Sequence, residues 1–317
     1  HPLLKFILKK ILQMIPMLLF ISFLIYGALQ LTGIDPVSYS VTPDMAGNQE
    51  NLDLLRERYG LNKPFLIRYV NWTEDILRGN FGYSITNGNS IGSILEQRLP
   101  ATIQLALVSM VVSAFLGVTI GIISAIYQNS IIDYLGRFFA VLGQAIPQFF
   151  FGICLIQLFS IKMGWLPSSG RYSTYATPLQ HFILPCLTLT LSLTSVLMRY
   201  SRNNMLGVLN SDYIKTARMK GISETKVYVK HAFRNALRPV LVILCFRLPM
   251  LISGSVVIES VYNWPGIGSV ITDAVIAGDY PVVMVTTLMV AAAILTASFL
   301  VDVLTALLDP RVRLGDG

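Results

Sequence analysis

The side chains that could perform chemistry are few in this sequence, and their spacing does not gather them into a site. Histidine and cysteine each occur three times, at His1, His181, His231, Cys154, Cys186 and Cys245. The cysteines all lie inside apolar runs, and no CxxC pair or Cys/His cluster occurs. No GxxxxGK[ST], GxSxG or HExxH motif is present. The sequence therefore predicts no catalytic residues, no metal site and no cofactor or nucleotide site of its own.

One charged residue stands apart because it lies inside an apolar stretch. Arg247 follows Pro239 by eight residues, which is about 12 Å along a helix. An ionised side chain buried at that depth is costly unless it faces water or a partner. Two interpretations stay open: a cation in a water-filled pathway, or an arginine that snorkels or forms an internal ion pair. We take Arg247, and Glu259 at the end of the same stretch, as candidate pathway residues.

The elements that must position these residues are membrane spans. Of the 317 residues 54% are hydrophobic and 13% are charged, and the mean hydropathy is +0.62. A soluble domain carries about a quarter charged residues, and disorder requires low hydrophobicity. A soluble domain and a disordered chain are therefore both excluded. We predict an all-α polytopic membrane protein with six transmembrane helices, near Ile11–Leu31, Ala101–Tyr127, Phe138–Ser160, Phe182–Tyr200, Val240–Glu259 and Val282–Leu308.

Lysine and arginine set the predicted orientation of these spans. With the N-terminus inside, the inner segments 1–10, 128–137, 199–238 and 309–317 hold 15 of the 24 Lys and Arg residues. The outer segments hold 8. Cytoplasmic loops carry the excess of positive charge, so the prediction is N-in and C-in. The formal charge of +7 is then a signal of topology, and no nucleic-acid partner is needed to explain it.

The pattern divides the chain into four parts. Residues 1–31 hold the first span, 32–98 form an extracytoplasmic insert, 99–308 hold the other five spans, and 309–317 form a cytoplasmic tail. The insert carries six aromatic residues between positions 59 and 83. That content favours a small folded cap over an unstructured loop.

The inner segment 199–238 has a helical pattern of its own. Ser211 or Asp212 can cap a helix with an acidic first turn and basic later turns, and Gly221 can end it in the left-handed conformation. A second helix opens at Ser223 and runs to Pro239. The segment is either an ordinary basic loop or, as we interpret it, a docking element built on a helix at about 212–221.

The second span carries a small residue at every fourth position, at Ser109, Ser113, Gly117, Gly121 and Ala125. Such a stripe lies on one helix face and lets another helix backbone approach closely. We interpret Ser113, Gly117 and Gly121 as helix-packing residues, and a ligand groove is the alternative.

Four stretches together resemble the permeases of ABC importers, closest to the dipeptide/oligopeptide/nickel permease family. The segment from Asp212 to Gly221, continuing through Asn235 to Pro239, is similar to the family's cytoplasmic coupling loop. The other stretches resemble its external insert, the exit of its fifth span and its C-terminus, at 59–84, 254–268 and 308–311. The general Glu-Ala-Ala opening of the coupling motif reads Lys215-Thr216-Ala217 here, although Gly221 stands at the expected distance.

The resemblance implies a type I ABC importer permease fold in a prokaryotic cytoplasmic membrane. The implied partners are a second homologous permease, two ATPase subunits that hold ATP and Mg, and an extracytoplasmic substrate-binding protein. The implied substrate is a di- or oligopeptide, or alternatively nickel or a metal chelate. The residues that would contact the ATPase are Asp212, Tyr213, Thr216, Ala217, Lys220 and Gly221.

Two other classes of function fit the sequence less well. A secondary transporter is disfavoured because the spans lack paired carboxylates and an evident inverted repeat. An intramembrane enzyme would need a nucleophile and a base at one depth, and the sequence offers none.

Overall fold

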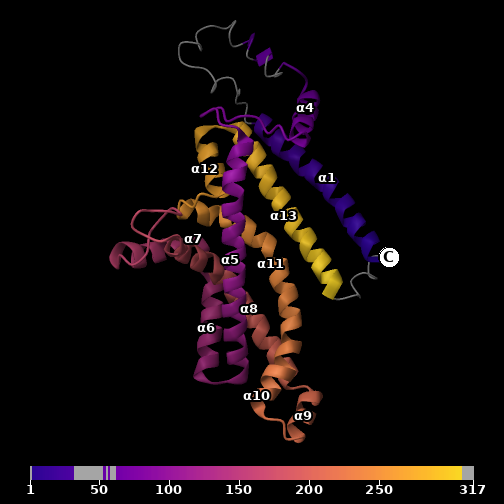
Figure 1. The fold of residues 1–317 in the computed structure, drawn as a ribbon, viewed down its shortest axis with the longest axis vertical. Helices are drawn as coiled ribbons and strands as arrows, with labels where there is room; N and C mark the ends of the chain where they lie inside the picture. The colour runs from indigo at the N-terminus through magenta and orange to yellow at the C-terminus, as the bar shows by residue number, and fades with distance from the viewer. Residues whose placement is uncertain (1, 32–52, 55, 58–61, 309–317) are drawn as a thin grey trace. The chain divides into compact units, whose positions relative to one another are not determined.

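The computed structural model describes residues 2–31, 53–54, 56–57 and 62–308. Within these residues the regular structure is helical, apart from an isolated bridge between Tyr83 and Ser90. Five helices are long and apolar enough to cross a membrane. They are α1 (Pro2–Leu31), α5 (Ile91–Ile126), α8 (Pro178–Leu209), α11 (Phe233–Val261) and α13 (Tyr280–Leu308) (Figure 1). The predicted all-α membrane fold is confirmed.

The third predicted span is not one continuous helix. It is divided between α6 (Ile131–Ala145) and α7 (Gln148–Leu155), which continues as a π-helical segment over Ile156–Lys162. The two halves are bent by 106°. Pro147 explains the bend, because the residue before a proline avoids helical geometry, and Ile146 is extended at φ −81° and ψ 126°. The described chain therefore has a sixth span only if this bent pair crosses as one unit.

Other elements also differ from the prediction. Helix α5 begins at Ile91, ahead of the predicted start at Ala101. The predicted helix from Ser223 to Pro239 is instead α10 (Glu224–Lys226), a π-helical segment Val227–Ala232, and α11, which runs through Pro239 without a break. Membrane helices tolerate proline because neighbouring groups satisfy the backbone it frees. The short apolar helix α12 (Ile267–Ala277) was not predicted at all.

The chain divides into two compact units, His1–Ala101 with Pro265–Phe299, and Thr102–Trp264 with Leu300–Gly317. In the first unit, α4 (Phe65–Leu77) from the insert packs on α1 through aromatic rings. Tyr26 lies with its ring centroid 5.3 Å from that of Trp72, and the hydroxyls of Ser22 and Tyr69 are 2.8 Å apart. The described part of the insert is thus ordered around aromatic packing.

A buried carboxylate holds the loop that follows α4. Asp279 lies between α12 and α13, and it accepts hydrogen bonds from the Ser84 hydroxyl, from Thr86 Oγ1 at 2.8 Å and from the Ile85 N–H at 3.2 Å. Its side chain has little exposure, at 2% for the residue. Hydrogen bonds to an ionised acceptor are stronger than neutral ones, so Asp279 fixes the loop against the α12–α13 turn.

In the second unit, the small residues of α5 lie against α8. A Cβ at Gly117 would be 2.6 Å from the Cβ of Leu197, and one at Gly121 would be 2.5 Å from the carbonyl oxygen of Met198. Ser113 is completely buried, and its hydroxyl donates to the Ser109 carbonyl at 2.7 Å. The two helix backbones approach too closely for any larger residue at the two glycines.

Candidate coupling site

The helix predicted at about 212–221 is α9 (Asp212–Met219), between the end of α8 and α10. The two short helices lie together at one end of α8 and α11 (Figure 1). Ser211 occupies the N-cap position with extended backbone, but its hydroxyl donates to the Val208 carbonyl and does not cap the helix. The predicted side-chain cap is therefore wrong, because a local turn competes for the same hydroxyl.

The end of α9 depends on Gly221, which has φ +73°. The Gly221 N–H donates to the Arg218 carbonyl at 3.0 Å, and the Ile222 N–H donates to the Ala217 carbonyl at 3.3 Å. This pair of bonds is a Schellman motif, which satisfies the last carbonyls of a helix and requires a left-handed residue. The conformation that the sequence predicted for Gly221 is present.

The two faces of α9 differ sharply in burial. Ile214 and Ala217, three residues apart, are buried in an apolar cluster with Met205, Val227 and Ala232. The opposite face is exposed, and Met219 has 81% of its surface open. The remaining residues proposed to contact the ATPase are also exposed: Asp212, Tyr213, Thr216, Lys220 and Gly221. Ala217 differs from them, because it anchors α9 to the cluster.

Two polar contacts brace the turn that carries α9, and sequence reasoning missed both. Arg218 donates to both Glu224 carboxylate oxygens, at 2.9 and 3.2 Å. The hydrogen bond from this guanidinium holds the pKa of the Glu224 carboxyl below its usual value. Asn235 Nδ2 donates to the Tyr213 hydroxyl at 3.0 Å and so ties α9 to α11. The opposite charges of Arg218 and Glu224, six residues apart across Gly221, were the available signal.

A buried ion pair joins α6 to α8. Asp133 is completely buried, and Arg202 donates to it from Nε at 2.6 Å and from a terminal nitrogen at 2.7 Å. The Ser124 hydroxyl and the Asn129 N–H, at 3.1 and 3.0 Å, complete the shell around the carboxylate. Arg202 precedes α9 on the same chain by ten residues. The ion pair therefore fixes α6 to the part of α8 that leads into α9.

The two candidate pathway residues do not share a site. Arg247 is half-buried and lines a cavity of 290 Å³ between α7, α8 and α11. Glu259 is completely buried and lies twelve residues further along α11, about 18 Å along the axis. Direct pairing between the two side chains is excluded by that separation.

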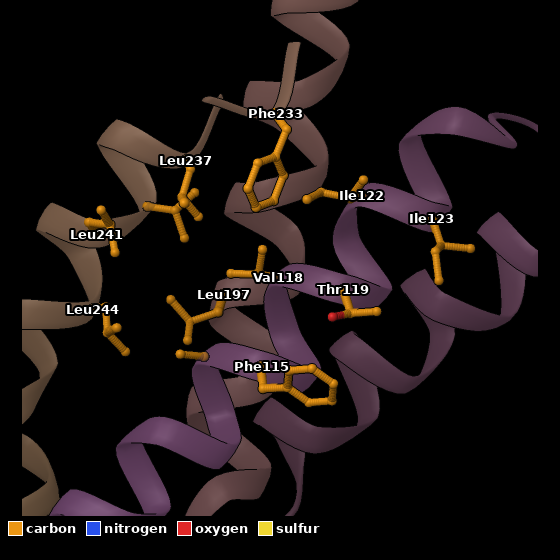
Figure 2. A pocket seen from close by; sticks show the side chains of 12 residues that line it. Phe115, Val118, Thr119, Ile122, Ile123, Leu197, Phe233, Leu237, Leu241 and Leu244 are labelled. Atoms are coloured by element: carbon orange, nitrogen blue, oxygen red, sulfur yellow. The ribbon is translucent and has the colours of Figure 1, made fainter. Parts of the chain in front are cut away.

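A second pocket, of 460 Å³, lies between α5, α8 and α11. Side chains of α11, among them Leu241, lie on one side of it and side chains of α5, among them Val118, lie on the other, with Leu197 of α8 between them (Figure 2). Of its twelve lining residues only Thr119 carries a polar side chain. The pocket can hold apolar groups but has no group for chemistry. Among the described residues, no cluster of His, Cys, Asp or Glu could hold a metal ion.

Comparison with known proteins identifies the family. Residues 117–314 match the family described as the binding-protein-dependent transport system inner membrane component, and residues 3–106 match the N-terminal part of such components. The chain belongs to this family. As a permease subunit of an ABC importer, it is a multi-pass protein of the bacterial cytoplasmic membrane, as the sequence predicted.

Individual relatives extend over nearly the whole permease. The oligopeptide transport system permease protein AppB of Bacillus subtilis is 37% identical, over 97% of this chain and 99% of its own length. The glutathione transport system permease protein GsiC of Salmonella typhimurium is 36% identical, over 98% and 99%. These relatives are transport subunits and not enzymes.

A solved structure shares the fold. The inward-facing MetNI methionine ABC transporter matches with a TM-score of 0.56 over 68% of this chain and 96% of the other, at 16% identity. At that identity the likeness supports the fold alone.

Proposed function

We propose that this permease forms half of the translocation pathway for di- or oligopeptides that a binding protein delivers. The observation that carries the proposal is similarity over nearly the full chain to an oligopeptide and a glutathione permease. Glutathione is itself a peptide, so both relatives favour a peptide substrate over the nickel or metal-chelate alternative. The lack of a metal-ligating cluster among the described residues agrees with that preference.

The complete importer contains a second homologous permease, two ATPase subunits and an extracytoplasmic binding protein. ATP and Mg belong to the ATPase subunits, since this sequence has no phosphate-binding loop. The exposed face of α9, from Asp212 to Lys220, is the surface that contacts the ATPase. A helix with one buried and one exposed face fits a groove on a partner, with Met219 as an apolar anchor.

The contacts that anchor α9 couple the ATPase to the membrane helices in this proposal. Ile214 and Ala217 pack into the apolar cluster, and the Schellman turn at Gly221 holds the other end. A force on the exposed face therefore passes to α8 and α11, which carry Arg202 and Arg247. When the ATPase pair closes on ATP, both docking helices move and the pathway opens outward. We propose Arg247 as the pathway residue of this half, since Glu259 is completely buried.

The test is uptake by the complete importer in proteoliposomes that contain ATP. We expect a labelled tripeptide to accumulate only with ATP and the binding protein together, and not with a non-hydrolysable ATP analogue. Accumulation driven by a proton gradient without ATP would support a secondary transporter. Accumulation of nickel without peptide uptake would establish the metal alternative.

A further inference from the structure

The cavity beside Arg247 combines apolar walls with a few polar groups. Helices α7, α8 and α11 line its 290 Å³, and apolar residues such as Leu193 and Leu251 form most of the lining. The polar side chains are those of Gln148, Ser192, Arg247 and Ser253. A small number of placed polar groups in an apolar pocket is typical of a site for an organic ligand.

These polar groups have unused hydrogen-bonding capacity. Within the described part of the chain, the one polar contact of the Arg247 guanidinium is to Met250 Sδ, at 3.1 Å. A thioether is a weak acceptor, and a guanidinium has five N–H donors. The hydroxyls of Ser192 and Ser253 likewise have no protein hydrogen bond among the described residues. Gln148 donates to the Leu189 carbonyl at 3.4 Å, which leaves its amide oxygen available.

A guanidinium in this setting favours a particular kind of ligand. A cation within a membrane span is stabilised by an anion or by water, and the planar fork of arginine matches a carboxylate with two parallel hydrogen bonds. The two serine hydroxyls can donate further hydrogen bonds to the same group. A divalent metal is disfavoured, because the lining includes a cation and no His, Cys or carboxylate.

We propose that this cavity is a carboxylate-binding subsite in the translocation pathway, which takes the C-terminal carboxylate of a peptide with an apolar side chain beside it. The proposal rests on the proposed peptide transport. Arg247 would bind the carboxylate, Ser192 and Ser253 would orient it, and the leucine walls would receive the last side chain. One cation that is half open to solvent binds weakly enough to release the peptide, as a transport pathway requires.

The experiment compares a tripeptide with its C-terminal amide in the reconstituted importer, at saturating concentrations of the loaded binding protein. Saturation separates the permease from the selectivity of the binding protein. We expect wild type to prefer the acid, and Arg247→Gln to lower the turnover of the acid by about tenfold, the size of a lost charge-assisted hydrogen bond. Turnover of the amide should fall much less, because a neutral carbonyl oxygen accepts a weaker hydrogen bond from the guanidinium. Lys162→Gln removes an exposed cation outside the cavity and is the matched control.

Other outcomes decide against the subsite. An unchanged ratio of acid to amide turnover in an assembled Arg247→Gln importer would overturn it. If that variant fails to assemble, the double variant Ser192→Ala/Ser253→Ala keeps the cation and tests the same cavity. A ratio lowered by about threefold supports the subsite, and an unchanged ratio overturns it. If wild type transports neither peptide, the proposed function fails and the subsite fails with it.

Discussion

Single residues control how α9 ends, and Gly221 is the clearest case. Its φ of +73° lies in the left-handed region, and no atom lies within 4 Å of where a Cβ would be. The requirement for glycine is therefore one of backbone conformation and not of space. Gly207 in α8 also has open space around it, but its φ is not in that region. The two glycines make a matched pair for mutation.

We predict that Gly221→Ala impairs coupling while Gly207→Ala does not. The first change costs roughly 1 kcal/mol because an L residue resists left-handed geometry. The second stabilises a helix by up to about 1 kcal/mol. Substrate-stimulated ATPase activity and peptide uptake of the complete importer measure the difference, and hydrogen exchange over 217–224 locates it. Equal effects of the two variants would contradict the role given to the turn.

The residue types of the site were predictable to different degrees. The left-handed conformation of Gly221 and the position of Arg247 inside an apolar stretch both follow from local sequence. A helix end and an apolar run can each be recognised over a few residues. The pair of Asp133 with Arg202 does not, since its members lie 69 residues apart. The cavity around Arg247 also escapes prediction, because three helices distant in sequence contribute its polar groups.

At the scale of elements, the ion pair between Asp133 and Arg202 sets the position of α6 against α8. Replacing both members of a buried ion pair by apolar residues often changes protein stability little. Removing one member alone leaves a buried charge and lowers the free energy of unfolding by about 3 kcal/mol or more. Arg137 also approaches Asp133, at 3.6 Å, but its side chain is 44% exposed. An exposed ion pair contributes at most about 1 kcal/mol.

We therefore predict a strong coupling energy in a double-mutant cycle. Asp133→Ala and Arg202→Ala should each lower thermal stability in detergent markedly, and the double variant should lose less than the sum of the two. Arg137→Ala should have a small effect and serves as the control. Additive losses for Asp133 and Arg202 would show that the pair does not hold the two helices together.

The long helices were predictable because each apolar run is longer than a membrane span. The exceptions have local causes. Pro147 divides one run into two helices, and the apolar run of α12 is too short to cross a membrane. Gly278, which ends α12 with φ +70°, was the signal that could have separated it from α13.

At the scale of the whole molecule, the distribution of lysine and arginine predicts the orientation in the membrane. Asn87, in the loop held by Asp279, and Lys220, at the end of α9, are both exposed in the structure. In a protein without Cys154, Cys186 and Cys245, a cysteine at Asn87 should react with an impermeant reagent from outside. A cysteine at Lys220 should react only from inside. Labelling of both positions from the same side would overturn the predicted orientation.

The proposed coupling depends on contact between α9 and the ATPase. The most direct test places a photoreactive amino acid at Met219, which is 81% exposed on α9, and at Tyr175, which is 99% exposed in a predicted outer segment, as the control. Both are irradiated in membranes that contain the complete importer. We predict that position 219 cross-links to an ATPase subunit and that position 175 does not. Failure of position 219 to cross-link to the ATPase in an importer that transports its substrate would contradict the central claim.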